Sequence, residues 1–251
     1  MIRIATLPPN YPKMKKTTHS IILSLLLIAT PVFATVSNAA TPGSDLADQS
    51  AYKDGWSSGS NGGTGFKGWN LISSTTSGAC GFFIGDSKNV GGGSGADINV
   101  NGKSFGMFGK GKDNSAEAYR SLDSGLKVGQ TVFFDIVVNF RNGLKGVDLR
   151  NAGDEKTIFN LNIGADDYVV NNAATGNGSI GNEYSQNTIF TFSFTQTSDT
   201  GGTWKVTRKG GVSKTVSGTY TGVAESFKFY VRDTDDGSEN DLYINNLTVT
   251  H

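Results

Sequence analysis

Residues 188–195 read Thr188-Ile-Phe-Thr-Phe-Ser-Phe-Thr195, and this stretch decides the fold class. Phe alternates with Thr or Ser, so the three Phe rings share one face of an extended chain and the hydroxyls share the other. That period of two is typical of a β-strand with one dry face and one solvated face. The stretch therefore predicts a strand that packs one face against a hydrophobic core.

The same alternation recurs in three other segments: Val132 to Phe140, Phe159 to Ile163 and Phe227 to Val231. Counting all such patterns gives about 12 to 14 strands of ordinary length, which is too many for one open sheet. Residues 114–123 are ambiguous between a short helix and a strand. The sequence therefore predicts an all-β fold, an antiparallel two-sheet sandwich of jelly-roll or concanavalin A-like type.

Glycine and asparagine mark the turns between these strands, because residues 43–251 contain no proline. The turn signals are four dipeptides, of which the first and last predict tight hairpins: Asn101-Gly102, Asn142-Gly143, Gly201-Gly202 and Gly210-Gly211.

Residues 1–39 have the pattern of a leader with an export signal. A basic group, Lys13-Met-Lys-Lys16, precedes an apolar run from Ile21 to Ala29 and then small residues up to Ala40. Residues 1–13 lie before the basic group, which makes Met14 an alternative initiator. The apolar run is short for a membrane span, and an uncleaved anchor is the alternative to cleavage.

After cleavage we expect a single β-sandwich domain over residues 45–251, secreted to the medium or held at the cell surface. No later segment has the roughly 20 apolar residues of a membrane span, so none is expected in the mature protein. Cys80 is the single cysteine and has no partner for a disulfide within the chain.

Charge and histidine content exclude several functions. The leader holds four basic residues and no acid, which leaves 18 basic and 22 acidic groups in residues 40–251. An acidic chain without a basic cluster is a poor nucleic-acid binder. One of the two histidines, His19, lies in the leader and the other, His251, ends the chain. A histidine-dependent relay or zinc site is therefore not expected.

Four short motifs carry a resemblance: Gly65-Phe-Lys-Gly-Trp69, Gly81-Phe-Phe-Ile-Gly85, Asp97 to Phe108, and Asp241-Leu-Tyr-Ile-Asn-Asn-Leu247. Together they resemble exported, glycine-rich bacterial β-sandwich proteins, a largely uncharacterised group. The last motif is also similar to the closing strand of jelly-roll carbohydrate-binding modules, where a Tyr-Ile-Asp-Asp sequence precedes an apolar residue. This chain departs from that sequence with Asn245 at the first Asp. The resemblance implies a sandwich fold, export and a carbohydrate ligand.

The densest acidic stretch, Asp233 to Asp241, is a candidate Ca²⁺ site. Calcium prefers six to eight oxygen ligands, and carboxylates that alternate around a Gly turn can supply several of them. The candidate ligands are Asp233, Asp235, Asp236, Asn240 and Asp241. A solvated acidic hairpin is the alternative interpretation.

Sugar binding needs aromatic faces together with groups that hydrogen-bond to hydroxyls. Trp56 is flanked by Gly and Ser and is the best candidate for an exposed platform, while Tyr168 and Tyr184 are weaker candidates near loops. Alternation with apolar neighbours places Trp69 and Trp204 in the core.

The strand at Leu242 to Val249 predicts a β-bulge. Leu242 and Ile244 occupy even positions, whereas Leu247 and Val249 occupy odd ones, so a regular strand would send the second pair to the opposite face. An extra residue at Asn245-Asn246 returns both pairs to the core. We expect the bulge to turn one amide toward the acidic loop or a neighbouring loop.

Catalysis is not expected, because the five Glu of the mature part are far apart in sequence and form no Glu-x-Asp-x-x-Glu strand of the kind in sandwich glucanases. Two carboxylates from different strands can still meet across one face. The favoured function is a secreted, non-catalytic glycan-binding protein, with a polysaccharide or cell-surface glycan as partner. The alternatives are a structural or adhesive protein of the cell surface or extracellular matrix and, third, a glycosidase or polysaccharide lyase.

Overall fold

The computed structural model describes residues 42–91, 95–152, 154–164, 168–172, 176, 178–181 and 185–251. These residues belong to one compact unit, Ala39–His251. The predicted leader and its export signal lie outside the described residues, as does the candidate Tyr184. Among the described residues, no helix is long and apolar enough to cross a membrane.

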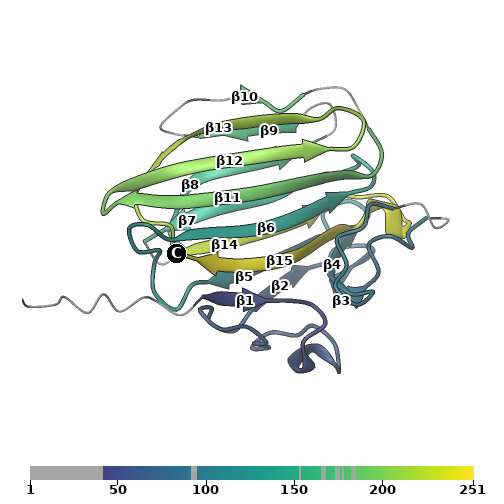
Figure 1. Ribbon diagram of the computed structural model, residues 1–251. Helices are drawn as coiled ribbons and strands as arrows, with labels where there is room; N and C mark the ends of the chain where they lie inside the picture. The colour runs from purple at the N-terminus through teal and green to yellow at the C-terminus, as the bar shows by residue number, and fades with distance from the viewer. Residues whose placement is uncertain are drawn as a thin grey trace, which may run out of the picture. The chain divides into compact units, whose positions relative to one another are not determined.

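The fold is an antiparallel two-sheet β-sandwich, as the sequence predicts (Figure 1). The eight-stranded sheet runs, in order, β13 (Lys214–Thr221), β12 (Gly201–Lys209), β11 (Thr188–Ser198), β6 (Thr131–Val138), β15 (Leu242–Thr250), β4 (Ser104–Lys110) and β3 (Ala79–Gly85), with β1 (Gly43–Asp45) paired to β15. The seven-stranded sheet runs β10 (Gly178–Ser179), β9 (Tyr168–Asn171), β8 (Lys156–Ile163), β7 (Leu144–Asn151), β14 (Ser226–Arg232), β5 (Ser115–Ser121) and β2 (Asn70–Ser74). Two 3₁₀ turns, η1 (Ser50–Tyr52) and η2 (Ser238–Asn240), complete the elements of the described residues.

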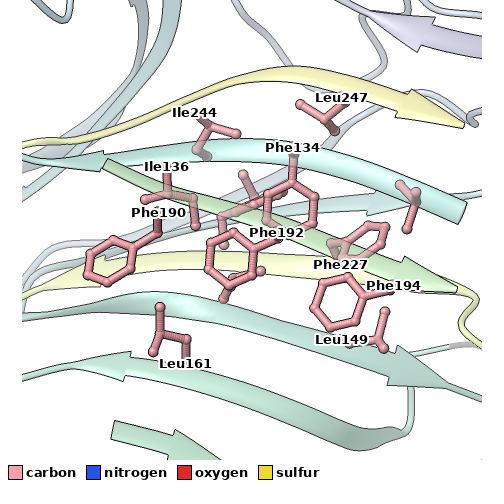
Figure 2. Packing of buried hydrophobic residues seen from close by; sticks show 14 of the residues in the cluster. Phe134, Ile136, Leu149, Leu161, Phe190, Phe192, Phe194, Phe227, Ile244 and Leu247 are labelled. Carbon is pink, nitrogen blue, oxygen red and sulfur yellow. The ribbon is translucent and has the colours of Figure 1, made fainter. Parts of the chain in front are cut away.

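The core between the sheets combines Phe rings with Leu, Ile and Val side chains (Figure 2). Phe190, Phe192 and Phe194 of β11 are all fully buried, which confirms the interpretation of their alternation. The Phe192 ring stacks on Phe134 of β6 with centroids 4.7 Å apart. Phe134 in turn meets Phe227 of the other sheet edge-on at 5.0 Å. Such pairs stabilise a core beyond the burial of their area, so these rings join the two sheets.

The ambiguous segment 114–123 forms β5, and its helical alternative was wrong. Ala116 and Ala118 face the core at alternate positions, as in a strand. The Asn101-Gly102 turn was predicted correctly: both residues have positive φ, and an isolated bridge joins Val100 to Lys103 around them. The Gly201-Gly202 pair lies in β12 rather than in a turn, because the chain reverses just before it.

The predicted β-bulge in β15 is present. The pairing of β15 with β6 shifts register between Asn245 and Thr248, and Asn246 has φ of 61°. Because of this shift, the four apolar residues of the strand all lie in the core: Leu242, Ile244, Leu247 and Val249.

The bulge turns the buried Asn245 amide toward neighbouring loops. Its Nδ2 donates to the carbonyl oxygens of Ile98 at 3.0 Å and Lys103 at 2.8 Å, and its Oδ1 accepts from the Ala47 N–H at 3.2 Å. The amide satisfies three main-chain groups, so it holds two loops against the closing strand.

A buried ion pair attaches the N-terminal strand. The Arg120 guanidinium of β5 lies 2.6 Å from the Asp45 carboxylate of β1, and both side chains are fully buried. Asp45 also accepts hydrogen bonds from Tyr52 Oη at 2.6 Å and Trp69 Nε1 at 3.0 Å. Burial raises the pKa of Asp45 and lowers that of Arg120, although their mutual attraction opposes both shifts. Desolvation therefore outweighs attraction in this pair.

Candidate functional site

The outer face of the seven-stranded sheet carries two rows of side chains that cross the strands. Strand register places these side chains next to one another, although they are far apart in sequence. The first row is Asn70, Tyr119, Lys228, Asp148, Asn160 and Asn171. The second row is Ile72, Glu117, Tyr230, Gly146, Asn162 and Val169. We call these two rows, together with Arg150, the polar face.

Asp148 is the centre of a hydrogen-bonded network on this face. Its Oδ2 lies 3.1 Å from Lys228 Nζ and 3.4 Å from Arg150 Nη1, and its Oδ1 accepts from Asn160 Nδ2 at 2.8 Å. The Asn160 Oδ1 accepts from Asn171 Nδ2 at 2.9 Å. These bonds link strands β14, β7, β8 and β9, so the side chains are held in fixed positions before any ligand binds.

A second branch of the network joins β5 to β14. Lys228 Nζ also lies 3.6 Å from Glu117 Oε1, and Glu117 Oε2 accepts a hydrogen bond from Tyr119 Oη at 2.9 Å. Lys228 thus stands between two carboxylates that come from β5 and β7. The sequence left open whether carboxylates from different strands meet on one face. Here two of them do, with the Lys228 ammonium between them.

A hollow of about 260 Å³ opens at the second row. Glu117, Asp148, Asn162, Lys228 and Tyr230 contribute to its lining. A glycine in the second row, at position 146, leaves room for the Tyr230 ring beside the hollow: a Cβ there would collide with the Tyr230 hydroxyl and with a main-chain carbonyl of β8. The Tyr230 phenol can therefore lie across β7 toward β8, where its oxygen accepts from Asn160 Nδ2 at 3.0 Å.

Both tyrosines of the polar face stay protonated at neutral pH. Burial raises the pKa of Tyr230 to about 12, and the hydrogen bond from Asn160 opposes this shift. Burial also raises the pKa of Tyr119 to about 12, together with its hydrogen bond to Glu117. Each phenol therefore keeps a proton that it can donate.

Two residues that line the hollow keep unused hydrogen-bonding capacity among the described residues. The Tyr230 hydroxyl accepts from Asn160 but donates to no acceptor. The Asn162 Oδ1 is buried and accepts no hydrogen bond. The unused Tyr230 proton is thus available to a ligand, whereas the Asn162 oxygen is an unsatisfied acceptor beneath the surface, an exception among buried polar groups.

The exposed platform predicted at Trp56 was wrong. Trp56 is only 5% exposed, and its ring packs against Trp69 and Phe105, each with centroids 4.9 Å away, and against Phe82 at 5.4 Å. The flanking Gly and Ser allow the chain to fold back, so the ring closes the end of the core near β3. Trp69 and Trp204 are buried, as expected.

Tyr168 is also no platform, because it is fully buried at the start of β9. The guanidinium groups of Arg208 and Arg141 lie 4.1 Å and 5.1 Å from its ring centroid. Cation–π contacts on a buried ring are structural, so Tyr168 helps to place two arginines in the sandwich.

The acidic loop does not gather its candidate ligands. Asp233 Oδ1 accepts from the Asp113 N–H at 2.7 Å, and Asp235 Oδ2 accepts from Asn142 Nδ2 at 2.8 Å. Asn240 Nδ2 donates to the main-chain carbonyl of Asp236 at 2.7 Å. In the described ranges, no three Asp, Glu, His or Cys side chains lie close enough to hold a metal ion.

The fifth candidate ligand, Asp241, is buried, and its Oδ1 has no hydrogen-bond partner within the described part of the chain. Burial raises the pKa of Asp241 to about 7. The loop carboxylates thus act separately: Asp233 and Asp235 accept hydrogen bonds from neighbouring turns, and Asp241 is buried. Calcium binding by this loop stays a prediction.

Sequence reasoning missed the polar face, although the strands that carry it were predicted. The signal lay at the alternate positions: Asn160 and Asn162 interleave with the apolar residues of β8, and Lys228 and Tyr230 interleave with those of β14. Amides and phenols at outward positions of several strands indicate a functional face only when register shows that they adjoin.

Comparisons with known proteins give weak structural likeness. No family model matches this chain, and no curated protein matches it. A K2 cleaved adhesin domain of Lys-gingipain has a TM-score of 0.40 at 11% identity; the match covers 84% of this chain and 98% of that one.

Two other solved structures are larger than the part they share with this chain. The ligand-binding domain of botulinum neurotoxin serotype D, in complex with N-acetylneuraminic acid, has a TM-score of 0.37 at 13% identity, covering 68% of this chain and 42% of that one. The enzymatically active domain of tailspike protein 4 of bacteriophage CBA120 has a TM-score of 0.35 at 11% identity, covering 72% and 19%. At these scores the likenesses carry no argument about ligand or activity.

Proposed function

We propose that the protein is an exported, non-catalytic glycan-binding protein that binds its ligand on the polar face. The observation that carries this proposal is the hollow, where carboxylate, amide and ammonium side chains surround a Tyr230 hydroxyl that accepts from Asn160 and donates to no acceptor among the described residues. A sugar ring presents hydroxyls that both donate and accept, which suits a phenol donor beside the carboxylates of Glu117 and Asp148.

The surrounding network supports binding rather than catalysis. Glycoside hydrolysis needs one carboxyl group as general acid and a second as base or nucleophile. Here Glu117 and Asp148 both pair with Lys228, and Asp148 also pairs with Arg150. The carboxylates are engaged with cations and amides, as in a rigid recognition surface.

A test of this function is a glycan array probed with the labelled protein, followed by titration of the best ligand. Tyr230→Phe removes the unused donor and keeps the ring, so we expect an affinity loss of about three- to tenfold. Thr203→Ala, on the exposed outer face of β12, is the matched control and leaves affinity unchanged. A wild-type protein that binds no glycan, or a Tyr230→Phe variant that binds as well as wild type, contradicts the proposal.

A structural role at the cell surface or in a matrix is the second candidate, and one observation favours it. The outer face of the eight-stranded sheet carries hydroxyl ladders, in which Thr131 and Thr195 lie 2.7 Å apart and Thr207 and Thr215 lie 3.0 Å apart between their Oγ1 atoms. Such a solvated face needs no ligand. An array without any bound glycan would favour this role.

A further inference from the structure

The charges at the centre of the polar face balance one another. Lys228 pairs with Glu117 and Asp148, and Arg150 pairs with Asp148, so two cations face two carboxylates. At the rim of the hollow, Arg232 Nε lies 3.5 Å from a carboxylate oxygen of Asp233. Each of these cations, within the described residues, therefore already has an anionic partner.

This balance disfavours an anionic sugar. A uronate or sulfate group needs a cation that can turn toward it; Lys228 could do so only by giving up its ion pairs with Glu117 and Asp148, and Arg150 only by giving up its pair with Asp148. The carboxylates of Glu117 and Asp148 would also repel the incoming anion at short range. Hydroxyls of a neutral sugar meet neither penalty, because they can donate to these carboxylates and accept from the Tyr230 phenol.

The polar face is elongated across the strands. The first row runs from Asn70 on β2 to Asn171 on β9 and crosses six adjacent strands. With strands about 4.8 Å apart, the row is roughly 24 Å long. The hollow of about 260 Å³ is smaller than an ordinary pocket for a complete small ligand. This combination suits an extended chain that places one sugar unit in the hollow and further units along the row.

We propose, on the basis of the proposed function, that the ligand of the polar face is an uncharged polysaccharide lying across the strands. Its affinity then increases with chain length until the row is filled. Binding is also nearly independent of salt, because no net charge is neutralised when the complex forms.

The test is calorimetric titration of the full chain with two sets of hexasaccharides, at about 50 mM and about 500 mM NaCl. The neutral set is cellohexaose, mannohexaose, xylohexaose and chitohexaose; the anionic set is hexagalacturonate, hexamannuronate and a heparin hexasaccharide. We expect the neutral hexasaccharides to bind more tightly than the anionic ones, with an affinity that salt changes less than about twofold and that is weaker for the matching disaccharide.

A charge variant tests the reason for this selectivity. Glu117→Gln releases Lys228 from one carboxylate and should increase affinity for hexagalacturonate about fivefold at low salt. Asp123→Asn, which removes an exposed loop carboxylate away from the polar face, is the control and gives no increase.

The outcomes separate the two proposals. Tighter binding of any anionic hexasaccharide than of the neutral set overturns the neutral-ligand inference and leaves glycan binding intact. Binding that does not depend on chain length overturns the extended geometry. Absence of binding to both sets overturns the inference and the proposed function together.

Discussion

Replacement of Lys145 by Met should stabilise the protein at neutral pH. Lys145 is fully buried in β7, at a register position between Ile163 and Val231, both of which are core residues. Its Nζ donates to the Phe140 carbonyl oxygen at 2.6 Å. Burial lowers the pKa of Lys145 from 10.5 to about 7, and the carboxylate of Asp241 opposes this shift.

The magnitude follows from this shift. Between pH 7 and pH 10.5 the unfolded chain keeps the Lys145 proton that the folded chain has lost. The free energy of unfolding of the wild type therefore increases by about 1.4 kcal/mol for each unit by which the pH rises. At about pH 7.5 the buried lysine therefore costs about 4 kcal/mol. Loss of its hydrogen bond offsets about 1 kcal/mol at every pH. The expected gain of Lys145→Met is about 3 kcal/mol at pH 7.5, and it becomes a loss of about 1 kcal/mol at pH 10.5.

The assay is urea unfolding of wild type and variant at several pH values from about 7.5 to about 10.5. Because the pKa of the buried Asp241 is itself about 7, this carboxyl is largely ionised in both states only above about pH 8, and the upper part of the interval reports mainly on the lysine. Lys205→Met, on an exposed side chain of β12, is the control and should change stability by less than about 0.5 kcal/mol throughout. A difference between Lys145→Met and wild type that does not vary with pH would refute the reasoning.

Three further substitutions test the scaffold by urea unfolding. Arg120→Met leaves the Asp45 carboxylate buried without its cation and should cost about 3–5 kcal/mol; in the double variant with Asp45→Asn the loss should be smaller than the sum of the two single losses, and simple additivity would contradict the pairing. Phe192→Ala removes a fully buried ring from the stack between the sheets and should cost about 3–5 kcal/mol, whereas a cost below about 1 kcal/mol would show that the core does not depend on it. Asn245→Ala leaves buried main-chain groups at the bulge without partners and should cost about 2–4 kcal/mol, and no loss would mean that water replaces the amide.

The fold was largely readable from the sequence because strand positions alternate between a dry and a wet face. The Phe alternation in β11 shows which face of the strand is buried. In β15 the apolar residues change from even to odd positions, which shows where an extra residue is inserted. The sandwich and its bulge could therefore be predicted from local sequence. The three-residue strand β1 was not predicted. It has no apolar side chain, and the partners of its buried Asp45, which are Arg120, Tyr52 and Trp69, come from later parts of the chain.

The site was much less predictable. Trp56 has polar and Gly neighbours, yet its exposure depends on whether the loop closes the end of the core, which is a tertiary property. Asp148, Asn160 and Lys228 are ordinary outward residues in their own strands. Only the register of β14, β7 and β8 brings them together, and pairing between distant strands is not encoded in any single segment.

The most direct test of the polar face is a heteronuclear NMR titration of the protein with the neutral hexasaccharide that binds best. We expect the largest shift changes at the side-chain amides of Asn160 and Asn162 and at the backbone amides around Lys228 and Tyr230. Changes concentrated instead at the separate hollow lined by Trp56, Phe82 and Phe83, or on the outer face of the eight-stranded sheet, would contradict the assignment of the polar face as the binding surface.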